Sequence, residues 1–268
     1  MKISLAYPFV FILFLLACNG SSDSTFDPES NLNEVTTLRR MIQKYPDSLL
    51  LREQLIQLYR DSGNYTAAIK DCDSLINRFP GYFKAWSIRS KLQFEKGDSL
   101  AALPSMERAV ILLPSKENLI ELGSLMAVLK DDRTPAVAEK LMTGTPSARK
   151  DGLLIKGIYY NNIEKYDSAI AFLEECLQLS YTNMNAYREK SIALYGQGKY
   201  NEALETLNIA ITLQNAFSEG YYYSGKCLEK LNRKEEARIA YETALALEDN
   251  DYPEASEAIA KLNTSHKK

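Results

Sequence analysis

The residues that most enzymes use for catalysis are scarce in this sequence. His266 is the only histidine of the 268-residue chain, which argues against a Ser-His-Asp triad, a Cys-His pair and a histidine-rich metal site. The adjacent carboxylates Glu174-Glu175 and Glu235-Glu236 lie in predicted helices, where neighbouring residues do not face each other. No Gly-x-x-x-x-Gly-Lys-Ser/Thr phosphate-binding loop occurs. The sequence therefore indicates a protein that is not an enzyme and binds no cofactor and no metal.

Charge and cysteine content exclude two further classes. The chain has 32 basic and 35 acidic residues, a net charge of -3, so nothing favours binding to nucleic acid. Four cysteines are too few for a disulfide scaffold. Cys72 and Cys176 fall on apolar helix faces and are predicted to be buried thiols, whereas the pattern does not place Cys227.

The fourth cysteine, Cys18, has a specific chemical context. Residues 1–17 contain one basic residue near the start and an unbroken apolar run over 9–16, which is too short to span a bilayer as a helix. The sequence Leu-Leu-Ala-Cys at positions 15–18 resembles the lipobox of bacterial lipoproteins. The resemblance implies cleavage of a 1–17 signal peptide after Ala17 and transfer of diacylglycerol to the Cys18 sulfur. The acyl chains would then anchor the mature protein to a membrane.

The residues after the cysteine suggest a location. Asn19 stands where an aspartate would favour inner-membrane retention, so we expect lipid anchoring in the outer membrane of the bacterial cell envelope. Residues 18–30 are polar and turn-forming, as a flexible tether would be. This opening also resembles Bacteroidota lipoproteins, which leaves open whether the body faces the periplasm or the cell surface.

The rest of the chain repeats with a period of 34 residues. Three columns of residues recur at steps of 34, 34, 33, 34 and 34. The first column is alanine throughout, five of the six residues in the second are small, and the third is mostly small or apolar. The columns are Ala68, Ala102, Ala136, Ala169, Ala203 and Ala237; Ile56, Ser90, Ser124, Gly157, Ser191 and Gly225; and Leu75, Ala109, Thr143, Cys176, Ala210 and Ala244.

These columns predict one helix pair per repeat, with small residues where the two helices approach. The pattern resembles the tetratricopeptide repeat (TPR) family over residues 49–251. The resemblance implies an all-α right-handed superhelix, an α-solenoid of about six repeats whose concave groove is lined mainly by the first helix of each pair. The repeats are 49–82, 83–116, 117–149, 150–183, 184–217 and 218–251.

One repeat and both ends depart from the pattern. Residues 117–149 are degenerate, because this repeat is one residue short and carries Thr134-Pro135 at its second helix, which we expect to be short or displaced. Residues 31–48 are predicted to form a half repeat, 252–263 a capping helix and 264–268 a disordered tail.

If the TPR register holds, part of each first helix faces the groove. Phe94, Tyr195 and Tyr222 are the most informative, since aromatic side chains outside the packing columns can anchor a partner, although tyrosines also fill gaps between repeats. Lys91, Arg188 and Lys226 could pair with acidic groups of a partner. The predicted groove residues are Lys84, Ser87, Lys91, Phe94, Asp151, Leu154, Ile158, Asn161, Asn185, Arg188, Ile192, Tyr195, Glu219, Tyr222 and Lys226.

These features favour a non-catalytic scaffold that binds a protein or peptide partner in its groove, in an assembly, secretion or adaptor role. The Lys/Asn arrangement with which chaperone-binding TPR proteins hold a terminal carboxylate is absent, so capture of a chaperone C-terminus is not predicted. The alternative is a glycan-binding or nutrient-uptake lipoprotein, for which the repeats leave little room. A homodimer through the terminal helices, and the identity of the partner, stay open.

Overall fold

The computed structural model describes residues 28–265, which fold entirely into helices with no strand among them. The predicted signal peptide and Cys18 lie outside these residues. Within 28–265, no helix combines the length and the apolar character that crossing a membrane requires. The helices are α1 (Pro28–Lys44), α2 (Leu49–Asp61), α3 (Tyr65–Arg78), α4 (Phe83–Glu95), α5 (Ser99–Leu112), α6 (Lys116–Val128), α7 (Thr134–Gly144), the 3-10 helix η1 (Pro146–Ala148), α8 (Arg149–Asn162), α9 (Tyr166–Leu179), α10 (Met184–Gly196), α11 (Tyr200–Leu213), α12 (Ser218–Lys230), α13 (Lys234–Leu247) and α14 (Pro253–Ser265).

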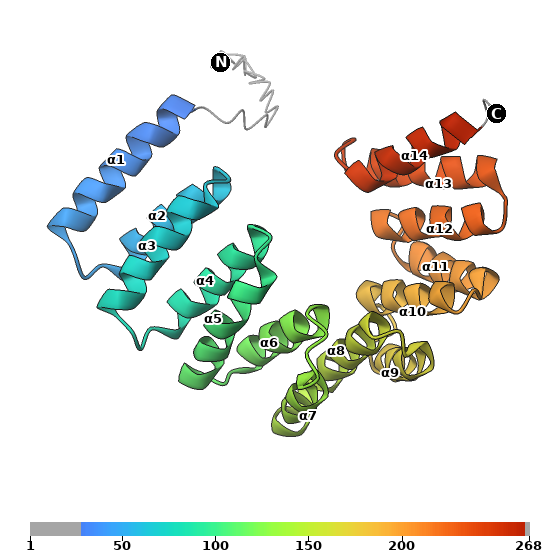
Figure 1. Ribbon diagram of the computed structural model, residues 1–268, viewed down its shortest axis with the longest axis horizontal. Coiled ribbons are helices and arrows are strands. Elements are labelled where there is room, and N and C mark those ends of the chain that lie inside the picture. The colour runs from blue at the N-terminus through green and yellow to red at the C-terminus, as the bar shows by residue number, and fades with distance from the viewer. Residues whose placement is uncertain (1–27, 266–268) are drawn as a thin grey trace, which may run out of the picture.

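The helices are stacked in pairs along an arc (Figure 1). Even-numbered helices from α2 to α12 are the first helices of the pairs, and odd-numbered helices from α3 to α13 are the second. Helices α6 and α8 lie on the inner side of the arc, whereas α7 and α9 lie on its outer side (Figure 1). The two ends of the array, at α1 and α14, face each other across the open side. The all-α superhelix of about six repeats that the sequence predicts is therefore confirmed.

Small residues bring the two helices of a pair close together, as the second column predicts. A Cβ atom added to Gly157 would lie 2.5 Å from Leu173 of α9, and one added to Gly225 would lie 2.5 Å from Tyr241 of α13. Distances below 3.0 Å cannot be accommodated without a shift of the neighbour. Ser90 fills the same position in α4, and its hydroxyl donates a 2.8 Å hydrogen bond to the Ala102 carbonyl.

The alanine of the first column is buried in five repeats, whereas the position predicted for it in the degenerate repeat is wrong. Ala68, Ala102, Ala169, Ala203 and Ala237 are all completely buried. Ala136, however, is exposed, and so is Thr143 of the third column. The completely buried residues of α7 are Thr134, Ala138 and Leu141, which keep the 4-and-3 spacing of Ala169, Leu173 and Cys176 in α9.

The turn before α7 explains this shift of register. A residue in the left-handed conformation follows each first helix, at positions 63, 97, 130, 164, 198 and 232, so the 33-residue step falls between Gly97 and Lys130. Counting back from Lys130 places Gly123, not Ser124, at the small-residue position, and a Cβ on Gly123 would lie 3.0 Å from Ile155. An additional turn over 131–133, closed by the Asp131 carboxylate, then delays the start of α7 to Thr134. Helix α7 consequently has 11 residues where α5 and α9 have 14, as the degenerate repeat predicts.

Candidate partner-binding groove

Three of the four basic residues predicted to face the groove are engaged in ion pairs between neighbouring first helices. Lys84 Nζ of α4 lies 2.5 Å from Glu53 of α2, and Lys91 Nζ of α4 lies 2.7 Å from Glu121 of α6. Arg188 of α10 reaches Glu219 of α12 over 2.7 Å. These charges therefore hold successive repeats together, and a partner's acidic group would have to share or displace the internal carboxylate.

Two polar residues predicted for the groove are buried in contacts between repeats. Ser87 is 7% exposed, and its hydroxyl donates a 3.1 Å hydrogen bond to Glu121. Asn161 is also 7% exposed, and its amide nitrogen donates to the backbone carbonyl of Glu189 (2.8 Å) and to its carboxylate (3.1 Å). Both side chains thus connect neighbouring first helices and present little surface to a partner.

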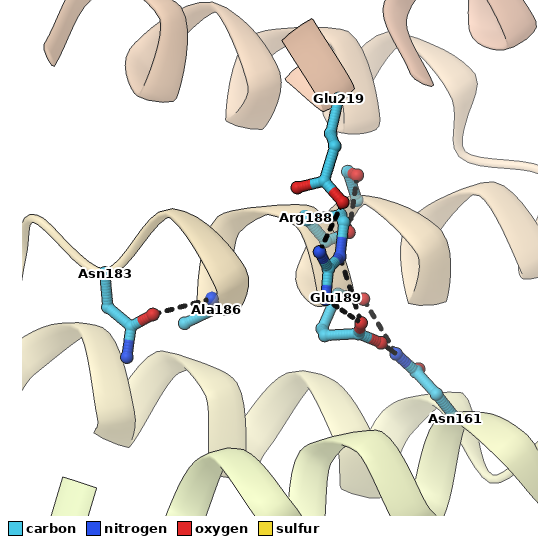
Figure 2. A network of polar contacts seen from close by, with 7 residues as sticks. Asn161, Asn183, Ala186, Arg188, Glu189 and Glu219 are labelled. Atoms are coloured by element: carbon cyan, nitrogen blue, oxygen red, sulfur yellow. Dashed lines mark hydrogen bonds and ion pairs between the residues drawn. The ribbon is translucent and has the colours of Figure 1, made fainter. Parts of the chain in front are cut away.

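Asn161, Glu189, Arg188 and Glu219 form a polar network that runs through three repeats (Figure 2). The Arg188 guanidinium donates to Glu189 of its own helix at 3.1 and 3.2 Å and to Glu219 at 2.7 Å. Burial alone would lower the pKa of Arg188, but the two carboxylates raise it above its ordinary value. The network therefore keeps a full positive charge half-buried between α10 and α12.

The aromatic residues predicted at the C-terminal end of the groove form a cluster around Lys226. The Lys226 ammonium lies 5.4 Å from the ring centroid of Tyr195, 5.7 Å from that of Tyr222 and 5.3 Å from that of Tyr223. Tyr222 also packs on Tyr252, with centroids 5.3 Å apart. Burial raises the pKa of Tyr195, Tyr222 and Tyr223, so all three phenols are neutral hydroxyl groups at pH 7. These tyrosines therefore pack on one another and on Lys226, and each stays half-buried.

The apolar residues of the groove differ in how much surface they expose. Leu154, Ile158 and Ile192 are half-buried, whereas Phe94 is 45% exposed. Beside it on α6 lies Val128, which is 48% exposed and was not predicted. The sequence predicts no groove residue in the degenerate repeat. Most residues of α6 from Leu119 to Val128 are apolar, so hydrophobic periodicity does not distinguish the exposed Val128 from its buried neighbours.

The three cysteines in the described part of the chain are free and buried. This confirms the prediction for Cys72 and Cys176 and places Cys227, which is 1% exposed, in the same class. Burial raises the pKa of the Cys72 thiol to about 12 and those of Cys176 and Cys227 to about 11. We expect all three thiols to resist a maleimide in the native protein at pH 7.5 and to react fully in denaturant, as counted by mass spectrometry. Labelling of any of them before unfolding would contradict this burial.

Comparison with known proteins agrees with this architecture. Family models described as tetratricopeptide repeat match residues 54–117, 151–183 and 188–252. A BBSome complex member BBS4 homolog from Drosophila melanogaster is 26% identical over 201 residues, which cover 72% of this chain and 40% of that protein. The chain thus spans about two fifths of the length of this relative.

Two solved structures share the fold over most of their length. A tetratricopeptide repeat protein from Parabacteroides merdae superposes with a TM-score of 0.74 at 18% identity, covering 88% of this chain and 93% of that one. The structure of PilW, described as a widely conserved type IV pilus biogenesis factor, gives a TM-score of 0.60 at 17% identity, covering 78% and 97%. The fold and its inter-repeat contacts define a helical-repeat solenoid, a class that typically serves as a non-catalytic interaction scaffold. Within that class, the chain belongs to the tetratricopeptide repeat family.

Proposed function

We propose that this protein is a non-catalytic scaffold that holds a segment of a partner protein in its concave groove. The observation that carries the proposal is the concave face itself, where the first helices leave clefts between successive repeats and Phe94 stands 45% exposed. A large aromatic side chain that belongs to none of the three packing columns is not needed at this position for the packing of the helix pair, whereas it suits a partner contact.

We further propose that the scaffold is a lipoprotein of the bacterial outer membrane. The Leu-Leu-Ala-Cys sequence at 15–18 supports attachment of lipid to Cys18, and the polar residues 19–27 would supply a spacer before α1, which begins at Pro28 and not after residue 30 as the sequence predicts. The fold that the chain shares with the pilus biogenesis factor makes an assembly or secretion role one concrete version of this function.

The anchor has a direct test. We expect the wild-type protein to sediment with outer membranes and to incorporate labelled palmitate in growing cells, because two or more acyl chains bind stably to a bilayer. Cys18→Ala should abolish both the label and the membrane association, while Cys72→Ala should change neither. A Cys18→Ala variant that still carries the label would overturn the lipoprotein proposal.

The scaffold function is tested by crosslinking in intact cells followed by identification of captured proteins. Phe94→Asp alters the N-terminal half of the groove and Lys226→Glu the C-terminal half. Ile111→Asp, at a 69% exposed position of the second helix α5 outside the clefts, is the matched control. The proposal expects a partner captured by wild type and by Ile111→Asp but lost in at least one groove variant. A partner retained by both groove variants would move the binding site away from the concave face.

A further inference from the structure

The N-terminal half of the groove contains two adjoining clefts, one on each side of α4. The first, of 340 Å³, lies between α2 and α4 and is lined by Leu50, Ile88 and several charged and amide residues. The second, of 290 Å³, lies between α4 and α6 and is lined by Phe94, Ile120 and Val128. Lys91 borders both clefts, so they form one continuous surface across three repeats.

This surface holds the large apolar side chains that the first helices leave in solvent. In the described part of the chain, Leu50, Phe94 and Val128 are the exposed large apolar residues on α2, α4, α6, α8, α10 and α12, at 65%, 45% and 48%. All three border the two clefts. The aromatic residues at the C-terminal end of the groove instead pack on each other and on Lys226.

The charges around the two clefts neutralise one another. Three basic and three acidic residues line them, and each basic residue is paired with an acidic one across neighbouring helices. The pairs are Arg60 with Glu95, Lys84 with Glu53, and Lys91 with Glu121. A charged ligand group would therefore lose its water without gaining an unpaired partner, which is unfavourable, whereas burial of an apolar group is favourable.

We propose that these clefts bind an uncharged segment of the partner protein that inserts one large apolar side chain on each side of α4. The inference rests on the proposed scaffold function and specifies the chemistry of the bound segment. Packed helices lie about 8–10 Å apart, and a segment in the polyproline II conformation advances about 3.1 Å per residue with three residues per turn. The two inserted side chains should therefore be about three residues apart, where they project from the same face of such a segment.

The test is selection from a random library of short peptides displayed on phage, using the full-length protein. Enriched peptides are then synthesised, and their affinities are measured by fluorescence anisotropy for wild type, Phe94→Asp, Lys226→Glu and the control Ile111→Asp. Circular dichroism and thermal unfolding establish that the variants are folded. We expect enriched peptides without net charge that carry two large apolar residues, with affinity at least tenfold weaker for Phe94→Asp and unchanged for Ile111→Asp.

Other outcomes separate this inference from the scaffold function. Enriched peptides that are charged, or that lose affinity for Lys226→Glu but not for Phe94→Asp, would overturn the inference and leave a concave binding site elsewhere in the groove. Peptides that bind equally to wild type and both groove variants would overturn the inference and contradict the concave site as well. Failure to enrich any peptide would overturn the inference, and the crosslinking experiment would then decide the scaffold function separately.

Discussion

Replacement of Tyr241 by alanine is expected to lower the free energy of unfolding by about 3–5 kcal/mol, the range found for loss of large aromatic side chains from protein cores. Tyr241 is 1% exposed and fills the space that Gly225 of α12 leaves open, with ring atoms 2.5–2.8 Å from where a Cβ would lie. Its hydroxyl donates a 2.8 Å hydrogen bond to Glu229, and burial raises its pKa far above the ordinary value. Urea unfolding followed by circular dichroism measures the loss.

Two variants divide this effect into its parts. Tyr241→Phe keeps the ring and removes the hydrogen bond to Glu229, so it should cost about 1 kcal/mol. Tyr181→Ala removes a tyrosine that is 67% exposed and should change stability by less than about 0.5 kcal/mol. If Tyr241→Ala were no more destabilising than Tyr181→Ala, the close packing of α12 on α13 would be wrong.

The loss at Tyr241 should also spread beyond its own repeat. Each repeat of a solenoid contacts only its neighbours, so the last pair, α12 and α13, depends on α11 and α14 for cover. Ala255 and Leu262 of α14 belong to the same buried cluster as Tyr241. Amide hydrogen exchange should therefore show faster exchange in α14 of the Tyr241→Ala variant, with α2 and α3 unchanged.

The repeat pattern predicted the helix pairs because each column reflects a local steric requirement. A small residue at the position of Gly157 or Gly225 lets the two helices of a pair approach closely, and such residues recur at this position in every pair but the first, which has Ile56. Asn64 and Asp98 cap the helices that follow them, since their side chains accept from the Ala67 and Ala101 amides at 3.1 and 3.0 Å, as short polar residues before a helix commonly do. Both features depend on residues close in sequence.

The register of α7 could not be predicted in the same way. The sequence columns align Ala136 with Ala102 because both residues are alanine. In the structure, the residue that the 33-residue step lacks is missing before α6, and an additional turn precedes α7. Pro135 lacks a backbone donor and is favoured in the first turn of a helix, where no intrahelical acceptor faces the amide, which agrees with the start of α7 at Thr134. Thr134 then occupies the completely buried position that alanine holds in the other repeats.

In the groove, the sequence likewise predicted what depends on nearby residues but not what depends on residues about one repeat away. Helical periodicity identified Phe94 as a residue outside the packing columns, and it is exposed. Periodicity could not identify the partners of Lys91 and Asn161, because Glu121 and Glu189 lie about one repeat away and meet them only when the solenoid assembles. Side chains that the sequence assigns to a partner contact can therefore make their hydrogen bonds and ion pairs within the protein instead.

The Arg188 network provides the second large expected effect. Arg188→Leu removes the guanidinium that pairs with Glu189, whose side chain is 12% exposed and, among the described residues, keeps only the Asn161 amide as a hydrogen-bond donor. An uncompensated carboxylate at this depth is costly, so we expect the free energy of unfolding to fall by about 2–4 kcal/mol. Because the network joins α8, α10 and α12, urea unfolding of the whole protein detects the change.

The exposed Arg238 supplies the matched control. Its side chain is 38% exposed and pairs with Glu235 and Glu242 of its own helix, so Arg238→Leu should leave the free energy of unfolding nearly unchanged. Adding Glu189→Gln to Arg188→Leu removes the unpaired charge and keeps an oxygen that can accept from Asn161. The double variant should therefore recover at least half of the lost stability. Equal effects of Arg188→Leu and Arg238→Leu, or no recovery in the double variant, would show that the buried carboxylate does not depend on Arg188.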